Sequence, residues 1–206
     1  MFDSIIFDVD GTIWDSTPVA ANAWNRALEE QGFSERVTAD RLKGLFGLPM
    51  DAIIKDIIPW ADDATRKDFA PHCFAYEHEY LARESGFVYQ GIHELFRKAS
   101  ARVPLFIVSN CQAGYIELML AKTGLGDTVT DHLCPGDTGL FKADNILKIV
   151  GKHNLTAPLY VGDTQMDLDA CRAAGVPFCY ATYGFGTADH PDHIIDSPLD
   201  LMKLLN

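Results

Sequence analysis

Two aspartates separated by a single residue, Asp8 and Asp10, have the types and spacing that could do chemistry. They follow a short apolar run, residues 4–7, that predicts a buried strand, and on an extended chain alternate side chains point to the same side. Gly11 then permits a sharp turn of the backbone. Like charges held close together raise their pKa values or require a cation. The pair therefore indicates a cation site, with an Asx-rich turn after an edge strand as the alternative interpretation.

Further polar residues follow apolar strands predicted at 103–108 and 158–161, or lie in the first turn of the next helix: Ser109, Asn110, Asp163 and Asp167. Lys142 is expected in a loop before another helix. In a doubly wound parallel sheet, ligands bind at the carboxyl ends of the strands. We therefore expect all of these side chains to meet the first two aspartates at one edge of the sheet.

The four aspartates would bring a formal charge of −4 together, and Lys142 would reduce it to −3. A hard divalent ion with oxygen ligands resolves this repulsion, and Mg²⁺ commonly retains waters and binds a phosphate oxygen of the substrate. With Mg²⁺ the sum is still −1, so charge alone does not attract a phosphate dianion. Backbone N–H groups after Asp8, together with Ser109, Lys142 and the metal, must hold the phosphate.

Each of these residues also has a structural interpretation when it is taken alone. Asp163 could cap the following helix, and Asp167 could lie favourably near its N-terminus. Lys142 could be a solvated surface lysine. Asn110 could simply form a turn, and Thr12 is an equally weak indicator. It is the joint pattern that favours a functional site.

The surrounding elements predict an α/β fold with a Rossmann-like, doubly wound parallel sheet and an inserted all-helical domain. Residues 16–84 show helical periodicity throughout, whereas the chain from residue 86 alternates between apolar strands and helices. Strands that are apolar along their whole length indicate a parallel sheet covered on both faces. We expect a core domain formed by residues 1–15 and 85–206, and a helical cap domain formed by residues 16–84.

Composition narrows the function classes. The chain has 206 residues, 48% of them hydrophobic, which supports a packed globular protein. Its formal net charge of −12 argues against nucleic acid or an anionic membrane as the main partner. Five scattered cysteines without a Cys-x-x-Cys pair suit a reducing cytosol, and no signal peptide or spanning run is evident. We expect a cytoplasmic protein that binds a small molecule.

The order of these motifs resembles that of the haloacid dehalogenase-like hydrolases, in the phosphoglycolate phosphatase-like branch with a helical cap. The resemblance rests on the Asp-x-Asp-x-Thr signature, a serine at a strand end, a lysine and Gly-Asp-x-x-x-Asp: Asp8 to Thr12, Ser109, Lys142, and Gly162 to Asp167. It implies a Mg²⁺-dependent phosphatase that hydrolyses a small phosphomonoester, phosphoglycolate-like or a sugar phosphate. The reaction would proceed through an aspartyl-phosphate intermediate.

The resemblance also implies roles for single residues. Asp8 would be the nucleophile and a metal ligand, and the side chain of Asp10 the general acid and base, while its backbone carbonyl binds the metal. Asp163 would bind the metal directly, and Asp167 directly or through water. Ser109 and Lys142 would bind phosphoryl oxygens. Further contacts to these oxygens would come from Asn110, Gly11 and Thr12.

Some positions depart from the family pattern. Ala143 follows the motif lysine where proline is common, Gln90 precedes Gly91 where proline is common, and Trp14 replaces a small aliphatic residue. These departures leave the substrate open. We expect the helical insert to choose it, in particular the loop 44–49, with Arg41 and Lys43 either meeting an anionic substrate or remaining solvated helix charges.

Three other functions remain open at this point. A phosphomutase of the same fold, similar to β-phosphoglucomutase, would return the phosphoryl group to a sugar. A dehalogenase would direct Asp8 at carbon and would not need the acid at Asp10. A non-catalytic regulatory protein would bind a phosphometabolite without turnover. Monomer and homodimer are both compatible with the sequence.

Overall fold

The computed structural model describes residues 2–205, which divide into two compact units. The core unit contains the chain up to Asp15 and again from Val88, and the helical unit is Ser16–Phe87. The chain thus returns to the core unit three residues after the boundary expected at 84/85. Two short strands lie where the chain leaves and re-enters, β2 (Trp14–Asp15) and β3 (Phe87–Val88), and they pair in a two-stranded sheet.

The core unit is built on a six-stranded sheet in which every pair of neighbouring strands is parallel. In spatial order its strands are β5 (Asp131–Leu133), β4 (Leu105–Val108), β1 (Ser4–Phe7), β6 (Pro158–Gly162), β7 (Phe178–Ala181) and β8 (His193–Ile195). Phe7 is in register with Ile107 on one side and Val161 on the other. Strands β1, β4 and β6 are buried throughout, as expected for a parallel sheet with two covered faces.

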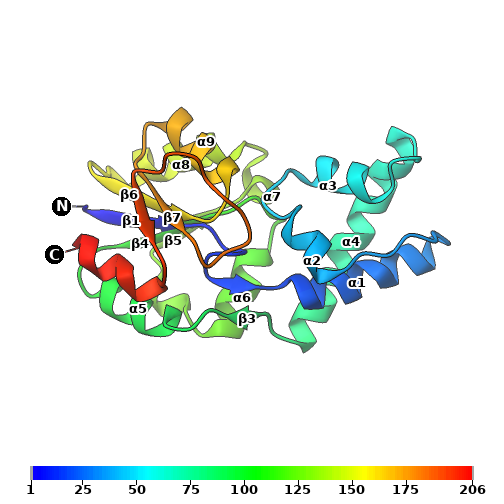
Figure 1. Cartoon of the computed structure of the whole chain (residues 1–206), viewed down its shortest axis with the longest axis horizontal. Coiled ribbons are helices and arrows are strands. Elements are labelled where there is room, and N and C mark those ends of the chain that lie inside the picture. Colours follow the sequence, from blue (N-terminus) through cyan, green and yellow to red (C-terminus); the bar gives the residue numbers. More distant parts are fainter. Residues whose placement is uncertain (1, 206) are drawn as a thin grey trace. The chain divides into compact units, whose positions relative to one another are not determined.

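Helices cover both faces of this sheet (Figure 1). On one face lie α8 (Lys142–His153) and α9 (Gln165–Ala174), and on the other α5 (Ile92–Ser100), α6 (Tyr115–Thr123) and the 3₁₀ helix η2 (Pro198–Leu205). Consecutive strand residues point to opposite faces. Ile6 packs with Ile146 and Leu168 of the first layer, whereas the ring of Phe7 lies 4.7 Å from that of Phe96 on α5. The predicted α/β fold is confirmed.

The last strand of the sheet carries no clear signal in the sequence. His193 begins β8 and pairs with Cys179. This edge strand has the pattern half-buried, exposed, buried, so it lacks the apolar run that marks the inner strands. Asp192 fixes its start, because its carboxylate accepts a hydrogen bond of 2.8 Å from the backbone of Phe178.

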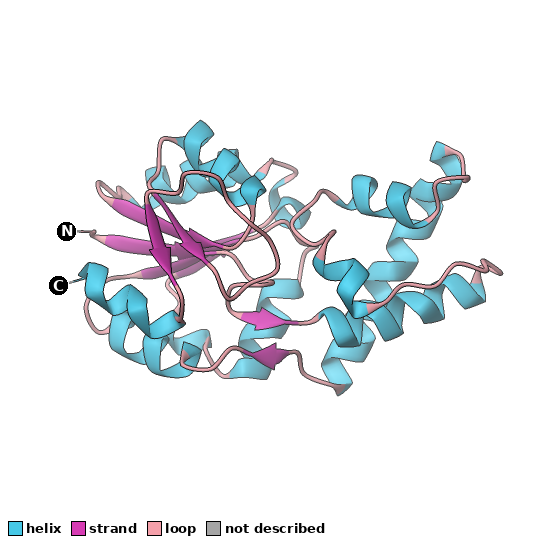
Figure 2. Cartoon of the chain, in the orientation of Figure 1, coloured by secondary structure: helices cyan, strands magenta, loops and turns pink. Residues whose placement is uncertain are grey.

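The helical unit contains α1 (Thr17–Glu30), α2 (Ala39–Lys43), α3 (Met50–Ile57) and α4 (Asp63–Arg83), which Figure 2 shows in cyan. Thr38 and Asp62 cap α2 and α4 with side-chain hydrogen bonds. Its own core gathers Trp24 and the isoleucines of α3. Buried Glu77 accepts a hydrogen bond of 3.0 Å from the indole of Trp24, which satisfies an acid in an apolar core.

None of the helices within residues 2–205 combines the length and the hydrophobicity that crossing a membrane requires.

Candidate active site

Three aspartates that are distant in sequence meet at the carboxyl edge of the sheet. Asp8 follows β1, Asp163 follows β6, and Asp167 lies in the first turn of α9. One carboxylate oxygen from each lies within 4.8 Å of the others, and all three residues are at most 3% exposed. The parallel register of β1 and β6 brings the first two together, because the strands end side by side.

Lys142 binds two of these three acids. Its Nζ lies 3.0 Å from Asp8 Oδ1 and 2.6 Å from Asp167 Oδ1, and its side chain is 4% exposed. The lysine is the first residue of α8 and not a loop residue, which corrects the sequence-based expectation. A solvated surface lysine is excluded by the same burial. Three negative charges against one positive charge leave a formal charge of −2 in this buried cluster.

The pKa values of these groups depend first on burial and then on the neighbouring charges. Burial raises the pKa of Asp8, although the nearby ammonium of Lys142 opposes the shift. Burial and the charges of Asp167 and Asp8 raise the pKa of Asp163 well above its usual range. Burial lowers the pKa of Lys142, but its two acidic partners outweigh that effect and raise it. The lysine is therefore charged, and the carboxylates lack a second positive charge.

Asp163 is held in one orientation from two sides. Thr12 Oγ1 donates to its Oδ1 at 3.2 Å, and the backbone N–H of Phe185 donates to its Oδ2 at 2.7 Å. Gly11 has a φ of +78°, and a Cβ atom there would overlap the carboxylate of Asp163. A Cβ at Gly184 would overlap Asp163 as well. Both glycines are thus needed for the close approach of two loops to this acid.

Asp167 has a structural role as well as a place in the cluster. Thr164 and Asp167 form a capping box at the start of α9, with the Thr164 hydroxyl 2.6 Å and its N–H 3.0 Å from Asp167 Oδ2. The other oxygen, Oδ1, faces Lys142 and the hydroxyl of Tyr160, 3.4 Å away. The capping interpretation and the cluster are both correct for this residue. The cap of α9 is Thr164, so the structure does not place Asp163 in that role.

Asp10 stands apart from the three clustered acids. β1 ends at Phe7, so Asp8 and Asp10 do not continue it as alternating strand residues. The carboxylate of Asp10 is half-buried and accepts a hydrogen bond of 2.8 Å from the hydroxyl of Tyr115 in α6. The ring of Tyr115 packs edge-on against buried Trp14, with 6.0 Å between centroids. A turn fixes this geometry, because the N–H groups of residues 12–14 point to the carbonyl of Val9.

The remaining predicted residues lie on the same edge. Ser109 follows β4, is buried, and makes a side-chain hydrogen bond to Asp8. Asn110 comes next and is half-buried. Burial raises the pKa of the neighbouring Cys111 thiol well above the usual range, which disfavours the thiolate form.

Sequence reasoning missed three contributors: Tyr115, Tyr160 and the backbone of Phe185. Tyr115 and Tyr160 read as ordinary apolar residues of a helix and a strand, and nothing in their spacing distinguishes them. The tract Gly184-Phe185-Gly186 did carry a signal, because two glycines around one residue indicate close backbone approach.

The donor set of the acid cluster suits a hard divalent cation. All of its donors are carboxylate oxygens, which Mg²⁺ prefers, and the cluster has an uncompensated charge of the right sign. Burial, and after it the neighbouring carboxylate charges, raise the pKa values of Asp8 and Asp163. These residues could therefore hold a metal ion.

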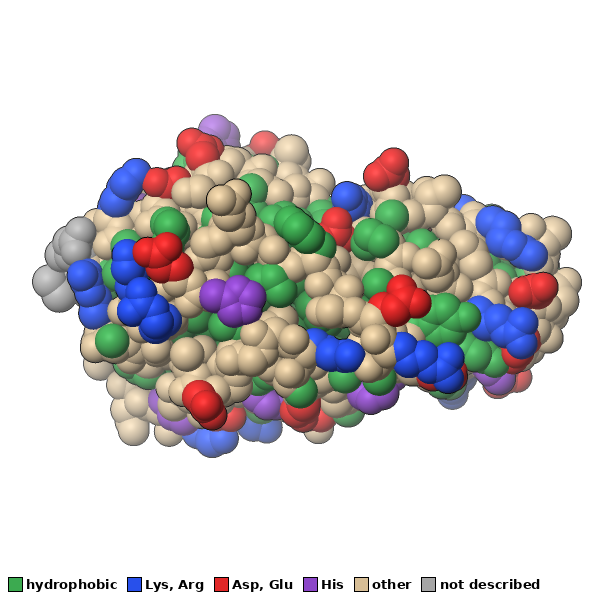
Figure 3. All heavy atoms as spheres, turned by 90° about the horizontal axis from the view of Figure 1, so that it is seen from below, with side chains coloured by type: hydrophobic (Ala, Val, Ile, Leu, Met, Phe, Trp, Pro, Cys, Tyr) green, Lys and Arg blue, Asp and Glu red, His purple; other side chains and the backbone are tan. Residues whose placement is uncertain are grey.

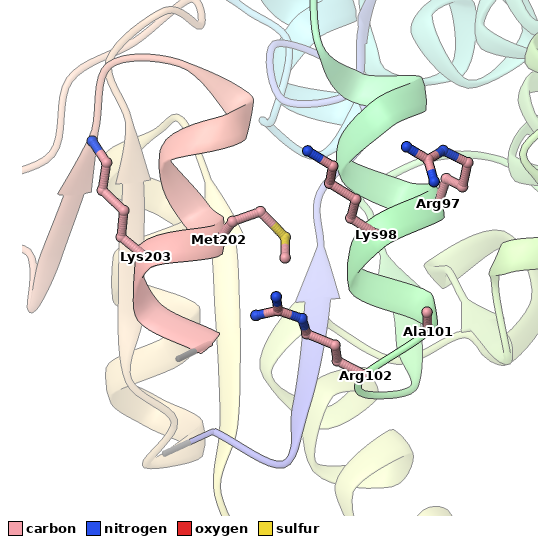
Figure 4. A pocket seen from close by; sticks show the side chains of 6 residues that line it. All are labelled: Arg97, Lys98, Ala101, Arg102, Met202 and Lys203. Carbon is pink, nitrogen blue, oxygen red and sulfur yellow. The ribbon is translucent and has the colours of Figure 1, made fainter.

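A separate cavity lies near the amino-terminal end of β4. Arg102, which lines it, precedes the first residue of that strand by three positions. It has a volume of about 430 Å³ and is lined by Arg97, Lys98, Ala101, Arg102, Met202 and Lys203. Figure 4 shows Arg102 and Met202 directed into the space between α5 and η2. Lys98 and Lys203 already pair with Glu94 and Asp200. In Figure 3, basic side chains gather at one end of the visible face with an acid among them. The cavity does not include the acid cluster.

Comparison with solved structures supports the fold. A haloacid dehalogenase-like family hydrolase from Streptococcus pneumoniae matches with a TM-score of 0.88 at 21% identity, covering 100% of this chain and 99% of that one. A HAD-superfamily hydrolase of subfamily IA, variant 1, from Geobacter sulfurreducens matches with a TM-score of 0.75 at 19% identity, covering 100% and 97%.

Comparison with curated proteins gives relatives over nearly the whole chain. Phosphoglycolate phosphatase of Photobacterium profundum is 28% identical over 221 residues, covering 97% of this chain and 95% of that protein. A plasmid phosphoglycolate phosphatase of Cupriavidus necator is 28% identical over 222 residues, covering 98% and 92%. The model of the haloacid dehalogenase-like hydrolase family matches residues 5–181. With this match over most of its length, the chain belongs to the haloacid dehalogenase-like hydrolases.

Proposed function

We propose that this chain hydrolyses a small phosphomonoester in a Mg²⁺-dependent reaction with Asp8 as nucleophile. One observation carries the proposal: Asp8, Asp163 and Asp167 converge at the carboxyl edge of the sheet with Lys142 between two of them. Lys142 bridges Asp8 and Asp167, and Asp163 is a third buried acid beside them. Neither packing nor helix capping requires Asp163 to lie there. Phosphoryl transfer requires such a combination of a carboxylate nucleophile, a cation and fixed donors.

The enzyme class is that of phosphoric monoester hydrolases, which the family and its curated relatives support. The relatives at 26–28% identity are named phosphoglycolate phosphatases. At that identity the substrate of this chain is inferred only as a class, a phosphoglycolate-like acid phosphate or a sugar phosphate.

In the first step a carboxylate oxygen of Asp8 forms a bond to phosphorus while the bond between phosphorus and the ester oxygen breaks. The departing alkoxide takes a proton from Asp10, and the phosphoryl group stays on Asp8 as an acyl phosphate. Lys142 and Ser109 both contact Asp8, so their donors lie beside the transferring group. A bound Mg²⁺, held by Asp8, Asp163, the carbonyl of Asp10 and Asp167 directly or through water, would supply charge stabilisation of the phosphoryl oxygens.

In the second step Asp10 removes a proton from a water molecule, whose oxygen attacks the phosphorus of the acyl phosphate. The bond between phosphorus and the Asp8 oxygen breaks, and inorganic phosphate leaves. Asp8 returns as a carboxylate. Tyr115 orients Asp10 for both proton transfers through its hydrogen bond of 2.8 Å. Gly11, Thr12 and Asn110 contribute to the loops around the phosphoryl group.

We propose further that the helical unit acts as the cap that selects the substrate. Its loop 44–49 is the segment that resembles the substrate-facing loop of such caps. The guanidinium of Arg41 already binds the carboxylate and the carbonyl of Asp56 at 2.7 Å and 2.8 Å, so an anionic substrate would compete with these contacts.

The test compares Asp8→Asn with Asp144→Asn, an acid-to-amide change at an exposed residue in the first turn of α8. With a generic aryl phosphate, we expect Asp8→Asn to lose turnover while its circular dichroism spectrum and unfolding midpoint stay near those of the parent. Asp144→Asn should keep full activity. Acid quenching of the parent enzyme with radiolabelled substrate should trap phosphate on the protein, and Asp8→Asn should trap none.

Several results would contradict the proposal. Turnover in Asp8→Asn would remove the covalent mechanism, and activity in excess EDTA would remove the metal. A panel of phosphorylated metabolites separates the remaining functions. Strong hydrolysis of one member supports the phosphatase. Phosphoryl exchange between sugar phosphates would indicate a mutase, and uniformly feeble rates with tight binding would indicate a regulatory protein.

A further inference from the structure

Glu117, His132 and Asp137 form a second group of metal-ligating side chains, outside the acid cluster. They come from α6, from β5 and from the short helix α7 (Pro135–Thr138), and one donor atom from each lies within 4.8 Å of the others. All three belong to the core unit. Nothing in the reaction proposed above uses them.

The imidazole of His132 carries an independent sign of a missing ligand. Its Nδ1 atom is shielded from solvent and has no hydrogen-bond partner among the described residues. Buried polar atoms almost always find a partner, because burial without one costs free energy. An ion bound at Nδ1 would satisfy this atom directly.

The two carboxylates are available for such an ion. Glu117 and Asp137 are exposed, and neither forms an ion pair with lysine, arginine or histidine within residues 2–205. The buried thiol of Cys134 donates to Oδ2 of Asp137 at 3.1 Å and so helps to orient this carboxylate. A supporting contact of this kind fixes the direction of a metal ligand. Glu117 lies in the first turn of α6 and can adjust its rotamer from solvent.

The donor chemistry identifies the class of ion. One imidazole nitrogen and two carboxylates suit Zn²⁺ and similar first-row ions, whereas Mg²⁺ and Ca²⁺ prefer oxygen alone. Two ligands of a tetrahedral zinc ion lie about 3.4 Å apart, so rotation of the exposed side chains is enough to close the group. We propose that Glu117, His132 and Asp137 bind a divalent first-row ion of the Zn²⁺ type, with water in the remaining position.

Such an ion would join three segments near the end of β4. The backbone N–H of Gly136 donates to the carbonyl of Cys111 at 3.1 Å, and Gly136 packs so closely on residues 112–113 that a Cβ there would overlap their backbone. A bound ion would therefore link α7 and β5 to α6. Residues 111–113, which follow Ser109, lie against α7 at this point. We expect the bound ion to raise the unfolding temperature, because it binds the folded arrangement only.

The test uses the full chain in excess Mg²⁺, which occupies the acid cluster, and adds Zn²⁺ alone as the probe. Competition with a zinc-chelating dye measures affinity, and X-ray absorption at the zinc edge identifies ligands. We expect one zinc per chain with an imidazole nitrogen among oxygen ligands, which the acid cluster cannot supply. His132→Gln and Glu117→Gln should each weaken binding at least about tenfold and remove the rise in unfolding temperature.

Two matched controls should leave binding unchanged. His78→Gln alters an exposed histidine of α4, and Glu94→Gln alters a first-turn glutamate of α5, the counterpart of Glu117 in α6. Should His132→Gln fail to fold, Glu117→Gln decides alone, because its side chain is exposed. The proposal is overturned if stoichiometric zinc binding is absent in excess Mg²⁺, if the zinc edge shows oxygen ligands only, or if the two test variants bind as tightly as the controls.

Discussion

The hydroxyl of Tyr115 donates a hydrogen bond of 2.8 Å to Oδ1 of Asp10. This bond joins the first turn of α6 to the turn after β1, two segments separated by about half the chain. Asp10 is not a member of the group formed by Asp8, Asp163 and Asp167. Asp10 therefore lies in a setting different from that of Asp8, which suits a proton-transfer group beside a nucleophile.

We predict that Tyr115→Phe lowers kcat by about tenfold to a hundredfold, because a hydrogen bond to a charged group contributes about 1.5–3 kcal/mol. The phenyl ring keeps the packing against Trp14, so the unfolding midpoint should change little. Steady-state kinetics with an aryl phosphate measures the effect. Tyr76→Phe, which removes a hydroxyl that binds Glu30 in the helical unit, serves as the control. Unchanged kcat in Tyr115→Phe would show that Asp10 needs no such support.

Gly11→Ala should destabilise the protein by more than the cost of its backbone conformation. Alanine at a φ of +78° is strained by about 1 kcal/mol, and here its Cβ would also overlap the carboxylate of Asp163. Gly32→Ala is a matched control, because its φ is +73° and nothing lies within 4 Å of the added Cβ. Urea unfolding should show a larger loss for Gly11→Ala. Equal losses would mean that the contact with Asp163 is easily relaxed.

We predict that Lys142→Met lowers the free energy of unfolding by about 3 kcal/mol or more at neutral pH, because it leaves buried acids without their cation. Lys152→Met removes a lysine from a more exposed pair with Asp131, whose side chains are 56% and 20% exposed. That variant should lose less than about 1 kcal/mol. Chemical denaturation without added metal measures both. Comparable losses in the two variants would contradict the buried-pair argument.

Mg²⁺ should stabilise the protein more at about pH 8 than at about pH 5, because of the raised pKa of Asp163. Without metal, the folded chain keeps a proton on this acid at pH values where the unfolded chain, with a pKa near 3.8, has lost it. The folded state then binds more protons, so its stability falls as pH rises through this window. A cation neutralises the carboxylate and restores the lost stability.

Unfolding temperatures with Mg²⁺ and with EDTA, measured across this pH range, test that prediction. Asp163→Asn should reduce both the gain and its pH dependence, because the amide neither titrates nor supplies a carboxylate ligand. A gain that is the same at both ends of the range would show that the acid cluster is not where Mg²⁺ stabilises the chain.

The sequence by itself determined the inner strands of the sheet, the insert and the identity of most residues in the candidate site. The apolar strands predicted at 4–7, 103–108 and 158–161 favour burial, and a parallel sheet places their carboxyl ends at one edge. Residues that follow such strands must meet there, so Asp8, Ser109 and Asp163 were predictable from local pattern alone. The helical insert was equally readable from its periodicity.

Only the tertiary structure decided the partners. Lys142 was expected in a loop, yet it starts α8 and bridges two acids, because helix docking and not local propensity places its ammonium. The hydrogen-bond partner of Asp10 is Tyr115, a residue 105 positions away.

The same holds for Glu117, His132 and Asp137, whose types are unremarkable where they stand in the chain. The positions of the apolar strands in the sequence indicate at which edge of the sheet a residue lies. Side-chain partners across that edge depend on the packing of helices and turns that are remote in sequence, and no local spacing contains that information.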